Sequence, residues 1–366
     1  MAAQIAIYVE SLLGRGHLAR AAALARALNG AGFAATLLTG SAGAPKDVAT
    51  IPLPALRARD QSIKALVDPN GLAPDAAYWA RRRAVLADAV AQLRPAAIVT
   101  ESYPFARPRF ADEAEALLDA GAAVGAVAIA SVRDILVAKS NPDFYPAAAE
   151  TARRRYARVL THGDPAVLHF RETFPAYNRI AEICLHTGYL WTPPIPIAAS
   201  AAGEVIVSTG GGRVGAALLA TALEARSRSR VFGAARWRLI AGPDADRVEA
   251  APDGFVIARA CADLPALLQT AAASISRCGY NTAIEVAAAD IPAVFVPFAD
   301  DRQTEQALRA DRFERMGFAK VVSEDRLSPE ALASALDAAA EAPRPSVAID
   351  LDGAAASVAA IRAAIS

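Results

Sequence analysis

Four short stretches of the sequence combine residue types at spacings that could bind a phosphorylated ligand or move a proton. The richest in glycine, residues 208–215, reads Ser-Thr-Gly-Gly-Gly-Arg-Val-Gly and joins an apolar run to an alanine-rich one. Glycines let main-chain N–H groups approach a ligand, and the N-terminus of a following helix adds partial positive charge. The stretch predicts a phosphate-binding turn, although it fits neither the P-loop nor the dinucleotide fingerprint. A glycine-rich turn without a ligand is the alternative.

A second stretch, residues 277–285, reads Arg-Cys-Gly-Tyr-Asn-Thr-Ala-Ile-Glu and joins another expected strand to a helix. Glu285 falls one to two turns into that helix, where a carboxylate can accept two hydrogen bonds from a vicinal diol such as a ribose. A surface or capping glutamate is the alternative. The third stretch, residues 297–306, gathers Asp, Gln and Glu at a helix start, which suits hydroxyl recognition or plain N-capping.

The fourth stretch places His17 at the first strand–helix turn, after Gly14, Arg15 and Gly16. A helix N-terminus disfavours the cationic form of a histidine, and the charge of Arg15 acts in the same direction. His17 is therefore expected to stay neutral and able to accept a proton. A purely structural histidine is the alternative.

The composition is that of a folded protein of about two domains. The chain has 366 residues, of which 54% are hydrophobic and 21% charged, and its net charge is zero. A nucleic-acid-binding protein usually carries a basic excess, so that class is disfavoured. The three cysteines are widely spaced and form no CxxC pair, so neither a disulfide framework nor a metal site is expected. No transmembrane segment is evident. The expected location is cytoplasmic, with peripheral contact at the inner face of the membrane left open.

The elements that must position these stretches alternate along the chain. Residues 4–10 form an apolar run typical of a buried parallel strand, residues 18–29 read as a helix and residues 33–39 as the next strand. The strand–helix alternation continues, with a further strand expected at 123–131. Polar residues follow several strands, which is where ligands bind in open α/β sheets.

A proline-rich segment interrupts this alternation. Residues 193–203 hold three prolines and several small residues, which indicates a linker, and the alternation restarts at residue 204. The sequence therefore predicts an α/β protein with domains at 1–192 and 204–345. A C-terminal helix at 346–366 could pack back on the first domain.

The segment 276–298, followed by Asp301, Arg302 and Gln303, resembles the C-terminal half of glycosyltransferases related to the peptidoglycan GlcNAc transferase MurG, of the family 28 C-terminal type. The shared pattern is an Arg, a Glu eight residues later, a Pro-Ala-Val-Phe-Val-Pro-Phe run and Asp-Arg-Gln. Residues 14–17 and 208–215 resemble the two glycine-rich turns of that family. The closest resemblance is to a branch of predicted glycosyltransferases, which shares Gly-Tyr-Asn-Thr at residues 279–282 and His-Gly-Asp-Pro at residues 162–165. The resemblance is dense over about 204–320 and thin over 40–200.

This resemblance implies the GT-B architecture, in which two Rossmann-like domains with parallel sheets face each other across a cleft. It implies an inverting, metal-independent, cofactor-free transfer of a sugar from a nucleotide diphosphate sugar, most commonly UDP-linked, to a hydroxyl acceptor. That acceptor could be a small molecule, a glycan or a lipid-linked molecule. A nucleotide-sugar hydrolase, a 2-epimerase and a non-catalytic nucleotide-sugar-binding protein are the alternatives. The basic and aromatic segment 78–83 could help form an acceptor pocket, or be a solvated helix face.

Carried over residue by residue, the resemblance implies a donor site on the C-terminal domain and a base on the N-terminal one. Glu285 would bind the ribose, while Gln303 and Thr304 would contact the sugar hydroxyls. His17 would deprotonate the acceptor, with Glu101 and Asp134 as alternative bases. Because Cys278 and Thr304 depart from the Ser and Gln of the family pattern, the donor sugar is left open. The full donor-binding set is Gly210, Gly211, Gly212, Arg213, Cys261, Arg277, Cys278, Gly279, Asn281, Thr282, Glu285, Gln303 and Thr304.

Overall fold

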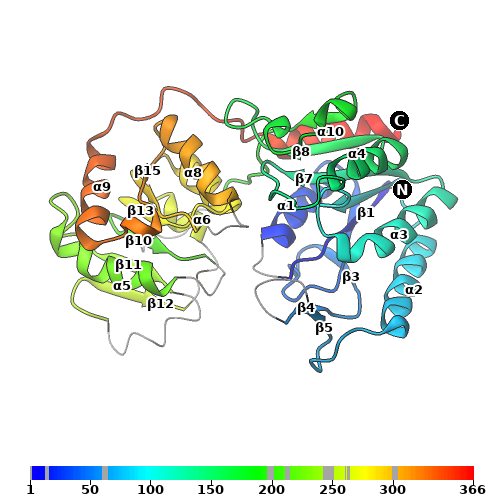
Figure 1. Ribbon diagram of the computed structural model, residues 1–366, viewed down its shortest axis with the longest axis horizontal. Helices are drawn as coiled ribbons and strands as arrows, with labels where there is room; N and C mark the ends of the chain where they lie inside the picture. The colour runs from blue at the N-terminus through cyan, green and yellow to red at the C-terminus, as the bar shows by residue number, and fades with distance from the viewer. Residues whose placement is uncertain are drawn as a thin grey trace. The chain divides into compact units, whose positions relative to one another are not determined.

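The chain forms two compact units in the computed structural model (Figure 1). Unit 1 comprises Met1–Leu190 and Asp350–Ser366, and unit 2 comprises Trp191–Ile349. The predicted linker at 193–203 lies only partly within the described residues. The structure describes residues 2–12, 16–59, 65–195, 202–210, 215–241, 251–259, 261, 264–298 and 304–366.

Unit 1 is built on a sheet of seven parallel strands, counted over the described residues, in the order β3-β2-β1-β6-β7-β8-β9. A separate antiparallel pair joins β4 (Arg57–Ala58) to β5 (Leu66–Val67). The strands of the large sheet are β1 (Gln4–Tyr8), β2 (Ala34–Thr39), β3 (Ala49–Pro52), β6 (Ala97–Glu101), β7 (Val127–Arg133), β8 (Arg158–His162) and β9 (Cys184–His186).

Helices cover both faces of this sheet because alternate residues of a strand point to opposite sides. Ile5 and Ile7 of β1 pack in one apolar core with α1 and α10, whereas Ala6 and Tyr8 pack in another with α2, α3 and α4. Helix α10 thus belongs to unit 1, although it follows unit 2 in the chain (Figure 1). The bounds are α1 (Gly16–Gly30), α2 (Ala76–Leu93), α3 (Ala111–Ala123), α4 (Phe144–Arg155) and α10 (Gly353–Ile365), with the 3-10 turns η1 (Pro108–Phe110), η2 (Phe170–Glu172) and η3 (Tyr177–Arg179).

Strand β7 differs from the strand expected at 123–131. Helix α3 continues to Ala123, and Gly125 then takes a positive φ of 81°, so the strand begins at Val127 and runs to Arg133. A short apolar run of alanine and valine suits a helix as well as a strand, which explains the misplaced start. The shift places Ser131 inside the strand and level with Glu101 of β6.

Unit 2 repeats the plan with six parallel strands in the order β12-β11-β10-β13-β14-β15, counted over its described residues. Helices α5 and α9 pack with Val205 and Val207 of β10 in one apolar core. The strands are β10 (Val205–Ser208), β11 (Trp237–Ile240), β12 (Phe255–Ala258), β13 (Ala273–Ser276), β14 (Ala293–Phe295) and β15 (Lys320–Val321). The helices are α5 (Ala216–Ala225), α6 (Leu264–Leu268), α7 (Tyr280–Ala289), α8 (Glu305–Arg315) and α9 (Pro329–Glu341), with the 3-10 turns η4 (Arg226–Arg228) and η6 (Glu324–Arg326).

Both sheets reverse their strand order at one point. The chain moves outward from β1 to β3, then crosses to β6 on the other side of β1, and unit 2 does the same between β10 and β13. Loops that leave the carboxyl ends of strands at such a reversal diverge and leave room for a ligand. The two parallel sheets confirm the predicted fold class. None of the helices in the described part of the chain is long and apolar enough to span a membrane.

Candidate functional site

The order reversal of unit 1 brings His17 and Glu101 together. His17 lies in the first turn of α1 and Glu101 ends β6, whose neighbour is β1. His17 Nδ1 is 3.1 Å from Glu101 Oε1. The side chain of His17 is 19% exposed and that of Glu101 only 1%, so the imidazole is the member of the pair that a solute can reach. An imidazole paired through Nδ1 keeps Nε2 for a proton transfer.

Burial and nearby charges keep His17 neutral and Glu101 ionised. Burial lowers the pKa of His17 to about 3, and the charges of Arg107 and Arg20 act in the same direction, although Glu101 opposes them. Burial alone would raise the pKa of Glu101, but the Arg20 guanidinium and His17 hold it well below its usual range. At neutral pH the pair is therefore a neutral imidazole facing a carboxylate.

Further polar groups hold the Glu101 carboxylate. Ser102 Oγ donates to Oε1 over 3.0 Å, and an Arg20 guanidinium nitrogen donates to the same oxygen. Ser131 Oγ donates to the other oxygen, Oε2, over 2.6 Å. Behind Ser131 lies His162, whose Nε2 is 2.9 Å from Ser131 Oγ. Sequence reasoning missed Ser131 and Arg20 as site residues, and the only signal for His162 was its place at a strand end.

The other predicted site residues of unit 1 are Asp134, which is buried, and the glycine-rich turn before His17, which is only partly described. Asp134 is 1% exposed, and its Oδ1 accepts the main-chain N–H of Ile135. Both alternative bases, Asp134 and Glu101, are thus buried, which favours His17. Gly16 begins α1 and is exposed, whereas Gly14 and Arg15 fall outside the described residues.

Segment 78–83 is not a purely solvated face, because Arg82 points inward. Its side chain is fully buried and bonds both Glu113, with Nε to Oε1 at 2.6 Å, and Glu10, with Nη2 to Oε1 at 2.5 Å. Tyr78 donates its hydroxyl proton to the Ala55 carbonyl over 2.5 Å. These contacts make Arg82 a structural residue.

The order reversal of unit 2 brings the start of the second glycine-rich turn, at Ser208, beside Arg277. Ser208, the last residue of β10, pairs with Ser276 at the end of β13. Gly210 then adopts a positive φ of 76°, which glycine takes without strain. Gly215 lies against Thr209, since a Cβ there would come within 2.5 Å of the Thr209 side chain. Three predicted residues of this turn fall outside the described residues: Gly211, Gly212 and Arg213.

Residues 277–279 connect β13 to α7 and combine a buried structural arginine with a helix start that no side chain caps. Arg277 donates to the Val296 carbonyl over 2.9 Å and to Glu324 Oε1 over 2.6 Å, so its guanidinium joins the strand end to η6. The Cys278 carbonyl accepts from Arg309 over 2.9 Å, and Cys278 is fully buried. Gly279 precedes α7, whose N-terminus has no side-chain cap.

Glu285 lies on α7 and is partly buried. Burial raises the pKa of its carboxyl to about 7. Within the described residues no hydrogen bond or ion pair reaches this carboxylate. A partly buried carboxyl without a protein partner is costly to ionise, and a pair of ligand hydroxyls would supply the missing donors.

The remaining predicted donor residues lie at loop and helix starts. Asn281 and Thr282 are half-buried in the first turn of α7, Thr304 is exposed just before α8, and Cys261 is half-buried. Gln303 falls outside the described residues. Over the described part of the chain, no cluster of three or more His, Cys, Asp or Glu side chains could hold a metal ion.

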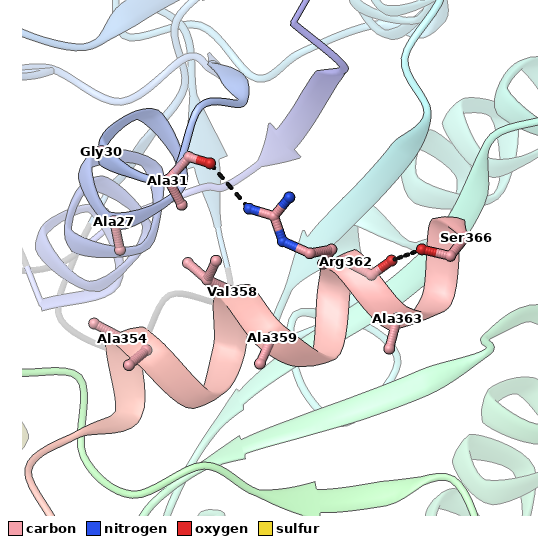
Figure 2. A pocket seen from close by; sticks show the side chains of 10 residues that line it. Ala27, Gly30, Ala31, Ala354, Val358, Ala359, Arg362, Ala363 and Ser366 are labelled. Carbon is pink, nitrogen blue, oxygen red and sulfur yellow. Dashed lines mark hydrogen bonds between the residues drawn. The ribbon is translucent and has the colours of Figure 1, made fainter.

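A surface hollow of about 610 Å³ lies elsewhere on unit 1, between the end of α1 and α10 (Figure 2). Its walls are mostly alanine, and Arg362 donates to the Ala31 carbonyl over 2.9 Å. None of the predicted site residues lines it.

Comparison with known proteins places these observations in a family context. Residues 255–348 match the glycosyltransferase family 28 C-terminal domain. A UDP-N-acetylglucosamine–N-acetylmuramyl-(pentapeptide) pyrophosphoryl-undecaprenol N-acetylglucosamine transferase from Brucella anthropi is 38% identical over 82 residues, which is 22% of this chain and 22% of that relative. The match thus spans about a fifth of the length of the curated relative.

Two solved structures match over nearly the whole chain. The glycotransferase of kitacinnamycin has a TM-score of 0.63 and 15% identity, with 99% of this chain and 96% of that chain covered. MurG of Acinetobacter baumannii has a TM-score of 0.59 and 16% identity, with 99% of each chain covered. At these identities the likeness shows the fold. The chain therefore has the GT-B fold, and residues 255–348 of its second unit match the glycosyltransferase family 28 C-terminal domain.

Proposed function

We propose that this protein is an inverting, metal-independent glycosyltransferase that moves a sugar from a nucleotide diphosphate sugar, with UDP expected, to a hydroxyl acceptor. The single observation that carries the proposal is the His17–Glu101 pair at the order reversal of unit 1. The family 28 domain of unit 2 and the GT-B fold support it.

The reaction is a single displacement in which His17 is the base. Nε2 of the neutral imidazole takes the proton of the acceptor hydroxyl while the acceptor oxygen attacks the anomeric carbon. The bond from that carbon to the donor diphosphate breaks, and the configuration inverts. Glu101 stabilises the imidazolium that forms, which then loses its proton to water.

Unit 2 would hold the donor. The glycine-rich turn after β10 and the open start of α7 would direct N–H groups and helix dipoles at the diphosphate, whose charge increases as it leaves. Glu285 would accept the two ribose hydroxyls. No metal is needed in this arrangement, so turnover should persist in EDTA.

The first test is nucleotide binding followed by turnover. Melting temperature is measured with UDP, GDP, dTDP and CMP, with ATP and NAD as controls, and a rise with one nucleoside diphosphate identifies the donor base. Nucleotide release from the matching sugar donor is then followed with candidate acceptors and with water alone. Release in water alone would indicate the hydrolase, and binding without release the non-catalytic protein. No shift at millimolar ligand would contradict the donor site itself.

Replacement of the base gives a sharper prediction. His17→Ala should leave the affinity for the nucleoside diphosphate unchanged and lower turnover by about 10²- to 10⁴-fold, as removal of a general base does. His169→Ala is the matched control, because His169 caps η2 and does not contact Glu101. Full turnover in His17→Ala would refute the assignment of the base.

A further inference from the structure

We propose that Ser131 and His162 are positioning residues that fix the Glu101 carboxylate and, through it, the tautomer of His17. The inference rests on the proposed role of His17 as the base. It concerns a buried chain of hydrogen bonds, here called the His17–Thr187 network, that consists of His17, Glu101, Ser131, His162 and Thr187.

The network crosses three neighbouring strand ends. Glu101 ends β6, Ser131 lies level with it in β7, and His162 ends β8. Counted over whole residues, Glu101 is 4% exposed, Ser131 2% and His162 0%, so water does not compete for these contacts. Ser131 Oγ is 2.6 Å from Glu101 Oε2 and 2.9 Å from His162 Nε2, and His162 Nδ1 is 3.0 Å from Thr187 Oγ1.

The proton positions in the network follow from its chemistry. A distance of 2.6 Å between a hydroxyl oxygen and an ionised carboxylate requires the Ser131 proton to lie between them. Ser131 Oγ has a single proton, so it can only accept from His162, which must carry its proton on Nε2. The Thr187 hydroxyl also lies 2.9 Å from the Gly188 carbonyl and 3.4 Å from the Thr161 carbonyl. With the His162 proton on Nε2, Nδ1 has only a lone pair, so the one Thr187 proton must turn from these carbonyls to Nδ1, 3.0 Å away.

The opposite order fails. If His162 accepted from Ser131, the lone pairs of Ser131 Oγ and Glu101 Oε2 would face each other at 2.6 Å inside the protein. Burial lowers the pKa of His162 to about 3, so the ring stays neutral and does not donate from both nitrogens. Every hydrogen bond of the network therefore points toward Glu101.

This direction matters at His17. With Oε2 held by Ser131, the carboxylate cannot rotate freely, and Oε1 stays opposite His17 Nδ1 at 3.1 Å. Arg20 Nη2 and Ser102 Oγ also lie 3.1 and 3.2 Å from Nδ1, but both donate to Glu101 Oε1. The anionic oxygen is then the acceptor that Nδ1 faces, and it favours the proton on Nδ1, which leaves the Nε2 lone pair for the acceptor hydroxyl. His162 itself touches neither reactant and acts only through Ser131 and Glu101.

Histidine tautomers are measured directly by long-range ¹H–¹⁵N correlation spectra of the full-length protein labelled in its four histidines. In the wild type, His17 should be protonated on Nδ1 and His162 on Nε2, both neutral down to pH 5.5. Ser131→Ala should shift His17 toward the Nε2-protonated form. Thr161→Val is the matched control, because Thr161 precedes His162 in β8 and its hydroxyl is buried and bonds nothing within the described residues.

Turnover of the sugar donor identified by the nucleotide screen gives the second readout. Ser131→Ala and His162→Leu should lower kcat by about 10- to 100-fold, the effect of losing one hydrogen bond to a charged group, with KM and nucleoside diphosphate affinity unchanged. His162→Gln should retain most of kcat, because its amide can still donate to Ser131.

The outcomes separate this inference from the proposed function. A His162 ring protonated on Nδ1 in the wild type, or a His17 tautomer unchanged by Ser131→Ala, overturns the inference whatever the turnover. If no sugar donor reacts but the tautomers follow the prediction, the proposed function fails and the positioning stands. The wild-type spectrum decides the proton order even if a variant does not fold.

Discussion

At the scale of single residues, Glu101 and Glu285 show how the surroundings of a carboxyl decide its use. Arg20, Ser102 and Ser131 donate to Glu101 and keep it ionised. Glu285 has no such partner in the described part of unit 2, and burial raises its pKa to about 7. The Glu101 carboxylate therefore has its hydrogen-bond donors within the protein, whereas Glu285 has none among the described residues.

The pH dependence of nucleotide binding follows from Glu285. In the proposed role, the ionised carboxylate of Glu285 accepts both ribose hydroxyls better than the protonated group does, so ligand binding is linked to loss of its proton. Below pH 7 the affinity for UDP, or for the nucleoside diphosphate that the screen identifies, should fall by about 10-fold per pH unit, and it should level off above pH 8. Isothermal titration between pH 5.5 and 8.5 measures this.

A matched variant tests the source of that dependence. Glu285→Gln should bind more weakly above pH 8 and show a smaller change of affinity between pH 6 and 8 than the wild type, because only the terminal phosphate of the ligand still titrates in this range. Wild-type affinity that stays constant over this range would rule out Glu285 as the ribose ligand.

At the scale of elements, Arg82 joins three parts of unit 1. The guanidinium on α2 bonds Glu113 on α3 and Glu10 just after β1, and the Tyr8 hydroxyl donates to Glu113 over 2.7 Å. Burial raises the pKa of Glu10, so its charge depends on the arginine beside it. Helix α2 is thus fixed by a buried ion cluster as well as by apolar packing.

Removal of this arginine should be costly. Arg82→Met leaves two carboxylates without their cation and should destabilise unit 1 by about 3–5 kcal/mol in urea unfolding at pH 7. Glu113→Gln in the same chain should recover part of that loss. Arg81→Met, on the exposed face of α2, is the control and should change stability by less than about 0.5 kcal/mol. A loss of similar size at both arginines would contradict the burial of Arg82.

How far the sequence could predict these features depends on the range of the interactions. The strand–turn–helix units around His17 and residues 208–215 depend on neighbours in the chain, so apolar runs and glycines predict them well. The contact between Glu101 and Ser131 depends on which strands pair, and these residues are 30 positions apart. Segment 78–83 gave no sign that Arg82 is buried, because its acidic partners are distant in sequence.

At the scale of the whole molecule, the titrating groups differ between the units. All four histidines lie in unit 1. Burial lowers the pKa of each, to about 3 for His17 and His162 and to about 4 for His186, and His169 shifts in the same direction. In unit 2, Glu285 shifts the other way.

The two units should therefore respond oppositely to acid. A histidine with a lowered folded pKa is protonated first in the unfolded chain, so unit 1 loses stability as the pH falls below about 6.5. The slope reaches about 1.4 kcal/mol per pH unit for each of the buried residues His17 and His162. The raised pKa of Glu10 acts in the opposite direction and stabilises unit 1 in acid, but it is a single group, whereas four histidines destabilise the unit. Glu285 binds a proton first in the folded state, so unit 2 gains stability between pH 7 and 4.5.

Differential scanning calorimetry between pH 7.5 and 5 checks this expectation. One transition should move to lower temperature while the other stays or rises, and His162→Gln should reduce the slope of the first. Two transitions that fall in parallel would show that these groups do not control the acid response.

The return of the chain to unit 1 bears on its synthesis. Tyr189 N–H donates to the Asp350 carbonyl over 2.8 Å, Leu190 forms a β-bridge with Asp352, and Ile361 of α10 is fully buried beside α1. A ribosome must therefore make all of unit 2, Trp191–Ile349, before it makes the helix that completes unit 1. At about 5–20 residues per second this takes roughly 10–30 s, during which the α10-facing side of α1 stays uncovered. In the nascent chain, the second unit can finish folding before the first.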